Sequence, residues 1–485
     1  MRLGVGSRVF TLEDQLRFAN ASGDWNPIHV DPVYARRCLT GQAVVHGTHV
    51  VMWALDAMAC NRNVRAAISE LNLQFHEPIF LEQTVDCYLI ESQAENALLE
   101  VYCANKLSIS IRVTAPTGHA RRAPVWEASA QTAKRLPMAR TADEIAHLSG
   151  RWSVDASVHA LAVMYPHLHE FLGETIAPML AHASRLVGME CPGLHSLFSE
   201  IELKASHSKT VALADFGYKV VSLDKRFGLV RAEVEGLGFA GVVTAFIRPP
   251  PRRQASFGEI AVEVNARAFE GQRALVVGGS RGLGEIVAKL LAAGGADVCL
   301  TFHQGQLEAS SVVDEIRDHG GQASCAPLDV TAPFDPHWSA PQGWRPTHLY
   351  YFATPFIFSG RRGEFSNELV ARLTKCYVSG FAEIVGVLAA EGLKGVFYPS
   401  TIALDEMPTD MAEYCAAKAA GEMLCQILQK RHASIAFSYE RLPRLATDQT
   451  ASLIPVKNAD PLPVMRNILL KMSAQKSDGV ARSES

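Results

Sequence analysis

Two side chains suited to acid–base chemistry stand close together near the start of the chain, in the segment SGDWNPIHVDP. Asp24 and His29 are five residues apart, and the Asn26–Pro27 step between them cannot continue a helix. A carboxylate and an imidazole held this close can share one water molecule and exchange protons with a substrate. The segment therefore predicts a site that handles water by acid–base catalysis.

A second pair lies far along the chain, in the segment AEYCAAKAAGE. Tyr414 and Lys418 are four residues apart, which puts both on one face of a helix. A neighbouring ammonium favours the phenolate and is expected to lower the pKa of the tyrosine, making it a general acid or base toward a carbonyl or an alcohol. Ser400 lies fourteen residues before Tyr414 and Thr401 thirteen, and both are candidates for a supporting hydroxyl.

The segment ALVVGGSRGLGEIVAKLLAAGGADVCLTFHQG predicts a strand, a glycine loop, a helix and a second strand, in that order. Gly278, Gly282 and Gly284 would let the backbone turn tightly beside a pyrophosphate, whose charge the helix N-terminus favours. Arg281 stands inside this loop, and the second strand ends without an acidic residue. Both features favour the 2′-phosphate of NADP(H).

The Asp24 segment is surrounded by patterns typical of a buried helix wrapped by an antiparallel sheet. Residues 12–21 predict a short helix that leads to Asp24, and THVVMWALDAMA, after Gly47, is apolar on nearly every side. Four segments then alternate apolar and polar residues, as half-buried strands do, at 71–75, 84–90, 97–103 and 107–114. A weaker echo of this pattern runs through 151–250.

The composition is that of an ordinary globular protein of two to four domains, with 485 residues, 48% hydrophobic and 20% charged. A net charge of −4 gives no electrostatic footprint for nucleic acid or for an anionic membrane. The ten cysteines are scattered without a CxxC pair, which argues against a disulfide framework or a zinc site. The start, MRLGVGSRVFTLEDQ, lacks an apolar run long enough for a signal peptide, and no stretch reaches the length of a membrane span, so we expect a cytoplasmic protein.

Composition also sets the expected domain boundaries. Residues 117–150 are polar and predict a linker, and the basic, proline-rich run RPPPRRQAS predicts a connector that extends over 251–268. The polar end, 471–485, predicts a disordered tail. Folded domains are then expected at 1–116, 151–250 and 269–470.

The pattern SGDxNPIHxDPxxA followed by VHG resembles the hydratase motif of the MaoC-like (R)-specific enoyl-thioester hydratases, which have the hot-dog fold. The resemblance implies that Asp24 and His29 form the catalytic pair, with Asn26 in support. It also implies that the Gly47 N–H binds the thioester oxygen. Such hydratases usually build each site where two hot-dog folds meet. We therefore expect a hydratase domain at 1–116 and a degenerate second hot-dog repeat at 151–250, which supplies the partner surface.

The glycine loop and the Tyr414 segment together resemble the short-chain dehydrogenase/reductase family, with a doubly wound Rossmann-type sheet. Serine is the family's usual catalytic hydroxyl, which favours Ser400, whereas the family spacing leaves Thr401 open. Asp329 lies where the family contacts adenine, although it also fits a turn at a strand end. FAT at 352–354 and Tyr377 depart from the family pattern. The cofactor contacts implied are Gly278, Ser280, Arg281, Gly282, Leu283, Gly284, His303, Asp329, Ala353 and Thr447.

The two resemblances imply a bifunctional enzyme of fatty-acyl or polyketide-type metabolism. One site would interconvert a trans-2-enoyl and a 3-hydroxyacyl thioester, and the other a 3-hydroxyacyl and a 3-ketoacyl thioester, both in the (3R) series. NADPH rather than NADH implies ketoreduction followed by dehydration. The reverse, oxidative direction stays open, as does a non-catalytic binding role for one half. The expected substrate is a thioester of coenzyme A or of acyl carrier protein, and a homodimer is a possible assembly.

Overall fold

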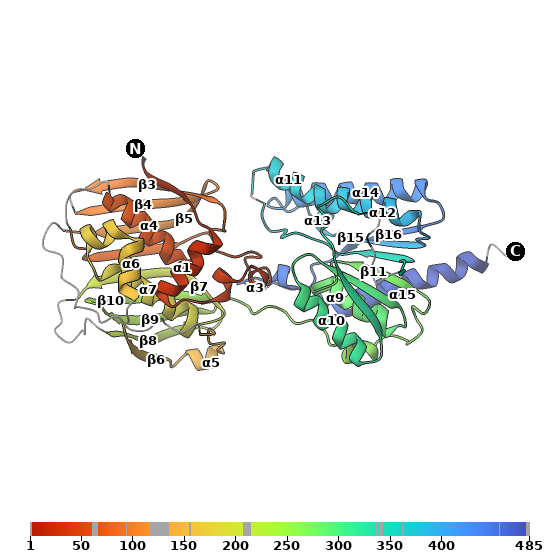
Figure 1. Cartoon of the computed structure of the whole chain (residues 1–485), viewed down its shortest axis with the longest axis horizontal. Helices are drawn as coiled ribbons and strands as arrows, with labels where there is room; N and C mark the ends of the chain where they lie inside the picture. Colours follow the sequence, from red (N-terminus) through yellow and green to blue (C-terminus); the bar gives the residue numbers. More distant parts are fainter. Residues whose placement is uncertain are drawn as a thin grey trace. The chain divides into compact units, whose positions relative to one another are not determined.

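The computed structural model describes residues 2–60, 66–93, 95–116, 135–154, 157–206, 215–335, 338, 343–360, 362–454 and 456–481. The chain divides into two compact units (Figure 1). The first is Met1–Pro250 with Ser452–Pro455, and the second is Pro251–Ala451 with Val456–Ser485. Among the described residues, no helix is long and apolar enough to cross a membrane.

The first unit is built on one ten-stranded antiparallel sheet, in the order β1-β3-β4-β5-β2-β7-β10-β9-β8-β6. Its strands are β1 Leu3–Val9, β2 Glu70–Phe75, β3 Thr84–Gln93, β4 Asn96–Cys103, β5 Lys106–Thr114, β6 Ser149–Ser153, β7 Ser196–Ala205, β8 Asp215–Asp224, β9 Leu229–Gly236 and β10 Phe239–Ile247. The sheet has two halves of five strands, which meet where β2 pairs with β7 in the register Leu71↔Leu203.

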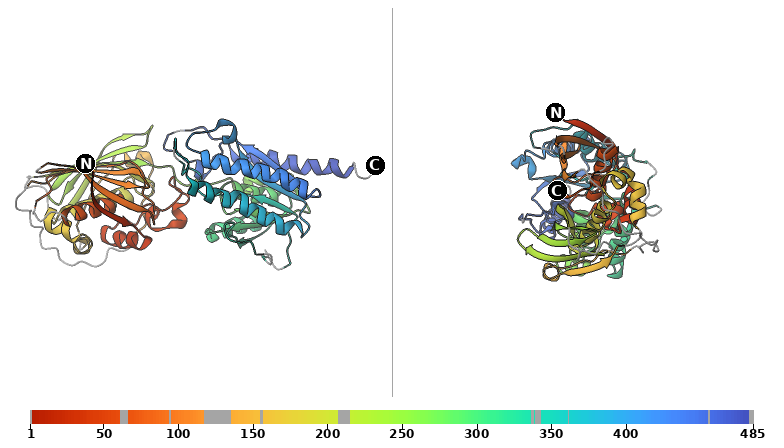
Figure 2. Two further views of the ribbon diagram at one scale, coloured as in Figure 1. Left: turned by 90° about the horizontal axis from the view of Figure 1, so that it is seen from above. Right: turned by 90° about the vertical axis from the view of Figure 1, so that its left-hand side faces the viewer.

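The helices of this unit lie along one face of the sheet (Figure 2). They include α1 Leu12–Ser22, α4 Gly47–Cys60, α6 Ser157–Met164 and α7 Ile176–Arg185. Helix α4 is buried along most of its length, as its all-round apolar sequence predicts. The strands alternate as expected, because in β4 every second side chain is buried. One continuous core cluster joins the two halves, so neither half packs alone.

The second unit is a six-stranded parallel sheet in the order β13-β12-β11-β14-β15-β16. Helices cover both of its faces, with α9, α10 and α15 on one side and α11, α12 and α14 on the other (Figure 1). This is the doubly wound arrangement that the sequence predicts. The strands are β11 Arg273–Val277, β12 Asp297–Phe302, β13 Gln322–Pro327, β14 His348–Tyr351, β15 Gly395–Thr401 and β16 Ala436–Leu442. The helices are α9 Gly282–Ala293, α10 Gln306–Asp318, α11 Asn367–Thr374, α12 Phe381–Ala389, α14 Ala412–Arg431 and α15 Pro461–Ala481.

Three predicted connections contain more structure than their composition suggests. Strand β6 begins at Ser149, inside the predicted linker 117–150, of which 117–134 lie outside the described residues. The predicted connector 251–268 holds the short helix α8, Phe257–Ala261, which buries Phe257 and Ile260. Helix α15 continues to Ala481, although a disordered tail is predicted from 471. Proline content and polarity alone indicate loops in the connector and the tail, whereas the structure has helix α8 in the first and the end of helix α15 in the second.

Candidate active sites

The turn that carries Asp24 is held by caps at both of its ends. Helix α1 begins at a capping box formed by Thr11 and Asp14, and it ends at Gly23, whose φ of 76° is a left-handed conformation suited to glycine. Asn26 then caps the short helix α2, Pro27–Val30, by accepting a hydrogen bond from the backbone N–H of Ile28 at 3.2 Å. This places Asp24 between two helices, where it is only 2% exposed.

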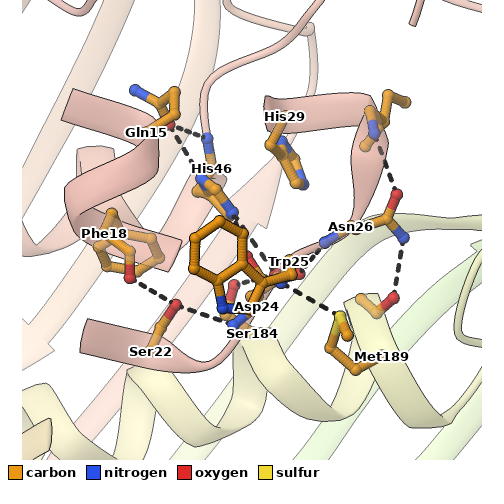
Figure 3. Close-up of polar contacts among 12 residues, drawn as sticks. Gln15, Phe18, Ser22, Asp24, Trp25, Asn26, His29, His46, Ser184 and Met189 are labelled. Atoms are coloured by element: carbon orange, nitrogen blue, oxygen red, sulfur yellow. Dashed lines mark hydrogen bonds and ion pairs between the residues drawn. The ribbon is translucent and has the colours of Figure 1, made fainter. Parts of the chain in front are cut away.

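The structure brings the predicted pair together. A carboxylate oxygen of Asp24 and ring nitrogens of His29 and His46 all lie within 4.8 Å of one another (Figure 3). His29 Nδ1 lies 2.9 Å from the carbonyl oxygen of Val44, an acceptor, so we assign the ring proton to Nδ1. The neutral ring then keeps a lone pair on Nε2, which can accept a proton.

The opposite half of the sheet completes this site. Ser184 Oγ, on α7, donates a hydrogen bond of 2.7 Å to Asp24 Oδ2 (Figure 3). Asn26 Nδ2 donates to the carbonyl oxygen of Gly188 at 2.8 Å. Gly188 leaves room for the carboxylate, because an added Cβ would lie 2.1 Å from Asp24 Oδ1. The sequence shows only a weaker echo of the first pattern in 151–250, and no motif marks Ser184 or Gly188 as part of the site.

His46 is a fully buried residue of the site that the sequence did not single out. Its ring stacks on that of His29, with centroids 3.9 Å apart. Its nitrogens lie 2.9 Å from Gln15 Oε1 and 3.1 Å from the Asp24 carbonyl oxygen. Asp24, His29 and His46 could also ligate a metal ion, although such an ion would have to compete with these two contacts of His46. The VHG motif was the available signal for this residue.

Burial tunes the two groups in opposite directions. It raises the pKa of Asp24 to about 6, against the lowering effect of hydrogen bonds from Ser184 and the Asn26 N–H. It lowers the pKa of His29 to about 4, against the hydrogen bond to Val44. At pH 7 the imidazole is therefore neutral and the carboxylate is mostly ionised. This pair can accept a proton from water and return one to a neighbouring carbon.

Gly47 stands beside this pair as the first residue of α4, directly after His46. The first N–H groups of a helix have no partner within the helix, and they face anionic groups favourably. An added Cβ at Gly47 would lie 2.5 Å from Cε1 of Phe75, so this position has no room for a side chain.

In the second unit, the glycine loop packs as closely as the sequence predicts. Gly278 follows β11 with a φ of 81°, and an added Cβ there would lie 2.8 Å from the backbone nitrogen of Ala353. An added Cβ at Gly284 would lie 2.2 Å from the Gly278 carbonyl oxygen. Ser280 is buried in the loop and Leu283 packs against the core. The loop brings the N-terminus of α9 to the carboxyl edge of the sheet.

Charged neighbours surround this loop. Arg281 Nη1 lies 3.6 Å from Asp448 Oδ2. The arginine that is predicted to bind the 2′-phosphate of NADP(H) is therefore already paired with an acidic residue. Thr447 lies close by, since its Cγ2 would be 4.0 Å from a Cβ at Gly282. His303 Nε2 lies 3.7 Å from Asp329 Oδ2. Asp329 Oδ1 accepts a hydrogen bond of 2.8 Å from a backbone N–H two residues on, which fits the alternative of a strand-end turn.

The structure separates the two candidate hydroxyls of the second site. Ser400 Oγ is buried and donates a hydrogen bond of 2.5 Å to Glu422 Oε1. Glu422 is in turn paired with Arg441 at 2.8 Å. The Thr401 hydroxyl instead hydrogen-bonds the Tyr414 side chain, and this contact opposes the rise in the pKa of Tyr414. The hydroxyl that contacts Tyr414 is therefore that of Thr401, and not that of Ser400, which the family's usual serine favours.

The expectation that Lys418 lowers the pKa of Tyr414 is wrong for this structure. Lys418 Nζ donates a hydrogen bond of 2.7 Å to the Pro399 carbonyl oxygen and lies 4.1 Å from the centroid of the Tyr377 ring. Burial raises the pKa of Tyr414 to about 12 and lowers that of Lys418 to about 7. Desolvation is therefore the main cause of the raised pKa of Tyr414, and Lys418 is not among the groups that shift this pKa.

The two departures from the family pattern lie together. The hydroxyl of Tyr377 and Thr354 Oγ1, the last residue of FAT, are 2.5 Å apart. The Tyr377 ring is also perpendicular to that of Tyr414, with centroids 5.8 Å apart. The two substitutions thus form one contact beside Tyr414.

Comparison with known families agrees with both units. Residues 5–105 match the MaoC like domain, and residues 272–336 match the short chain dehydrogenase family. The mitochondrial 3-hydroxyacyl-(acyl-carrier-protein) dehydratase of Arabidopsis thaliana is 32% identical over 75 residues, covering 16% of this chain and 45% of that protein. A hydroxynaphthalene reductase-like protein Arp2 of Metarhizium guizhouense is 38% identical over 69 residues, covering 14% and 26%. The chain thus spans less than half the length of these two relatives.

A further alignment points elsewhere. It links 33% of this chain to 96% of the adenine phosphoribosyltransferase of Mycobacteroides abscessus, with 30% identity over 178 residues. Neither family model supports that relationship. The antiparallel sheet around the Asp24 segment and the parallel sheet behind the glycine loop agree instead with the two matched families.

Solved structures similar to part of the chain include a dehydrogenase/reductase from Sinorhizobium meliloti, with 18% identity and a TM-score of 0.36, covering 43% of this chain and 90% of that one. Another is a 3-oxoacyl (acyl-carrier-protein) reductase from Agrobacterium tumefaciens with NADP bound, with 20% identity and a TM-score of 0.33, covering 37% and 73%. Residues 5–105 thus belong to a MaoC-like domain, and residues 272–336, in the second unit, belong to a short-chain dehydrogenase domain of the same chain.

Proposed function

We propose that this chain is a bifunctional enzyme, a (3R)-hydroxyacyl-thioester dehydratase/enoyl hydratase joined to an NADPH-dependent 3-ketoacyl-thioester reductase. The observation that carries the proposal is the pairing of the buried Asp24 with the partly buried His29, which has a free imidazole lone pair, while Ser184 from the opposite half of the unit holds the carboxylate. Burial raises the pKa of Asp24 to about 6, close to neutral pH, as is common for groups that exchange protons at active sites.

In the hydration direction, Asp24 and His29 hold one water molecule between them. As the water oxygen bonds to C3 of the enoyl thioester, one water proton passes to Nε2 of His29, and the pair returns a proton to C2. The Gly47 N–H stabilises the negative charge that develops on the thioester oxygen. Dehydration follows the same steps in reverse.

The second site fits a nicotinamide dinucleotide. The cradle of Gly278 and Gly284 admits no side chains, and the N-terminus of α9 can face a pyrophosphate. A bound NADPH would supply the hydride for reduction of the 3-keto group. Tyr414 then donates its phenolic proton to the carbonyl oxygen, supported by Thr401, while Lys418 donates to the Pro399 carbonyl oxygen and packs against the Tyr377 ring.

The second half of the sheet is proposed to be a degenerate hot-dog repeat at 151–250. It pairs edge to edge with the first half through β7 and contributes Ser184 and Gly188 to the Asp24 site. No Asp-x4-His block occurs in 151–250. One complete hydratase site can therefore form within a single chain.

Arg281 favours the biosynthetic direction, in which the product of ketoreduction is the substrate for dehydration. Both reactions can be assayed on the purified protein with acetoacetyl and crotonyl thioesters, each on coenzyme A and on acyl carrier protein, with NADPH and NADH. We expect NADPH oxidation with the acetoacetyl thioester and hydration of the crotonyl thioester. Saturable NADPH binding without ketoreduction would show instead that the second unit is a binding module.

A further inference from the structure

Arg248 is a fully buried cation with unused hydrogen-bonding capacity. It follows β10 directly and is 0% exposed. Only Nη2 has an acceptor, the carbonyl oxygen of Leu194 at 2.6 Å. Nε and Nη1 have no hydrogen-bond partner among the residues that the structure describes. A buried guanidinium in this state costs considerable free energy, because no carboxylate among the described residues compensates its charge.

The surroundings of Arg248 hold no opposite charge. The guanidinium carbon lies 6.0 Å from the centroid of the Tyr34 ring, and the backbone N–H of Arg248 donates to the His195 carbonyl oxygen at 2.7 Å. His195 Nδ1 is also buried without a partner within the described part of the chain. No described carboxylate forms an ion pair with Arg248. The cluster is thus rich in hydrogen-bond donors and poor in anions.

Arg248 adjoins the hydratase pair. The Leu194 carbonyl oxygen that accepts from Arg248 also accepts from Asn26 Nδ2 at 3.3 Å. Burial is the main cause of the low pKa of His29, and the charge of Arg248 lowers that pKa further. The guanidinium of Arg248 therefore lies close to the turn that carries Asp24, Asn26 and His29.

We propose that Arg248 binds a carboxylate carried by the acyl chain of the hydratase substrate, so that this site prefers monothioesters of dicarboxylic acids. The inference rests on the proposed hydratase function. The phosphates of coenzyme A or of a carrier protein's pantetheine are at the far end of a long arm, whereas Arg248 shares the Leu194 carbonyl oxygen with Asn26 of the hydratase turn. A substrate carboxylate would both neutralise the buried charge and accept from its free nitrogens.

Binding of unreactive, saturated thioesters tests this without turnover. Calorimetry should give wild-type protein at least tenfold tighter binding of glutaryl-CoA than of butyryl-CoA, the scale of a charge-assisted hydrogen bond. Arg248→Gln should reduce this ratio to near one, and Arg248→Lys should retain part of it. Arg231→Gln, on the exposed face of β9, is the matched control and should keep the wild-type ratio. Equal binding of both ligands by the wild type would overturn the proposal, even if Arg248→Gln fails to fold.

A kinetic measurement separates this proposal from the hydratase assignment. Wild-type kcat/KM should be higher for glutaconyl-CoA, which is crotonyl-CoA with a carboxylate on its terminal carbon, than for crotonyl-CoA itself. Arg248→Gln should lower that ratio about tenfold or more. Equal losses on both substrates would show that Arg248 acts on the thioester or on the fold. Hydration of neither substrate, combined with selective glutaryl-CoA binding, would refute the hydratase function but keep the carboxylate site.

Discussion

The two candidate sites respond differently to the same physical force. At the Asp24 site, burial moves the carboxyl pKa to about 6 and the imidazole pKa to about 4, so both groups are in usable protonation states near neutral pH. At the Tyr414 site, burial raises the phenol pKa to about 12, and the ammonium of Lys418 is directed to a backbone carbonyl. Desolvation prepares the first site for proton exchange, whereas it keeps Tyr414 protonated as an acid.

The two sites differ in the hydrogen bonds that oppose the effect of burial on the pKa of Asp24 and of Tyr414. Asp24 receives hydrogen bonds from Ser184, which lies 160 residues away, and from the N–H of Asn26. Tyr414 receives one from Thr401, and its neighbours Tyr377 and Thr354 bond to each other. The hydratase site is therefore sensitive to the second half of the sheet, and the reductase site to the hydroxyl at the end of β15.

The largest expected effect tests the first half of this comparison. Asp24→Asn removes the carboxylate, and His29→Ala removes the imidazole lone pair. Each should lower kcat for crotonyl-thioester hydration about 10²-fold or more, the usual scale for acid–base groups. Ketoreduction in the same proteins is the control and should stay near the wild-type rate. Near-normal hydration in both variants would remove the basis for the hydratase assignment.

The second prediction concerns the hydroxyl of the reductase. Thr401→Val should lower ketoreduction about 10²-fold, because Tyr414 loses its hydrogen-bond partner. Ser400→Ala is the matched variant, and its main effect should be on stability, by about 1 kcal/mol, through the lost hydrogen bond to Glu422. Steady-state kinetics and thermal unfolding separate the two effects. The reverse ranking of the two variants in kcat would assign the role to Ser400.

The third prediction concerns the dinucleotide. Arg281→Ala should weaken NADPH binding by about 1.5–3 kcal/mol while leaving NADH binding little changed, because only NADPH carries the 2′-phosphate. Fluorescence titration of both nucleotides measures this. Asp448→Asn tests the ion pair separately. If Arg281→Ala weakens both nucleotides alike, the arginine acts through its pair with Asp448.

The smallest expected effect tests the link between the two halves of the sheet. Ser184→Ala removes a hydrogen bond that lowers the pKa of Asp24, so that pKa should rise above about 6. The acidic limb of the hydratase pH–rate profile should then move to higher pH, with a loss of about tenfold at pH 6 and less at pH 8. Ser222→Ala, at an exposed position of β8, should leave the profile in place. An unshifted limb in Ser184→Ala would mean that this hydroxyl does not tune the carboxylate.

The sequence predicts the local parts of each site and misses the distant ones. The Asp24–His29 turn, the alternating strands and the close-packed glycines follow from short-range patterns, and the structure contains them. Ser184 and Gly188 escape detection because they meet Asp24 only after β2 and β7 pair. The choice between Ser400 and Thr401 depends on which face of β15 meets α14. The pKa of Tyr414 depends on burial, which spacing does not reveal.

The central claim is that one chain carries out two consecutive steps, and product analysis of a single incubation tests it most directly. Purified protein is given acetoacetyl thioester and NADPH, and the acyl products are followed by mass spectrometry. The wild type should form 3-hydroxybutyryl and then crotonyl thioester. Asp24→Asn should stop at the 3-hydroxybutyryl thioester, and Tyr414→Phe should form neither product while still hydrating added crotonyl thioester. Unchanged acetoacetyl thioester with the wild type, under conditions in which NADPH binds, would contradict the account.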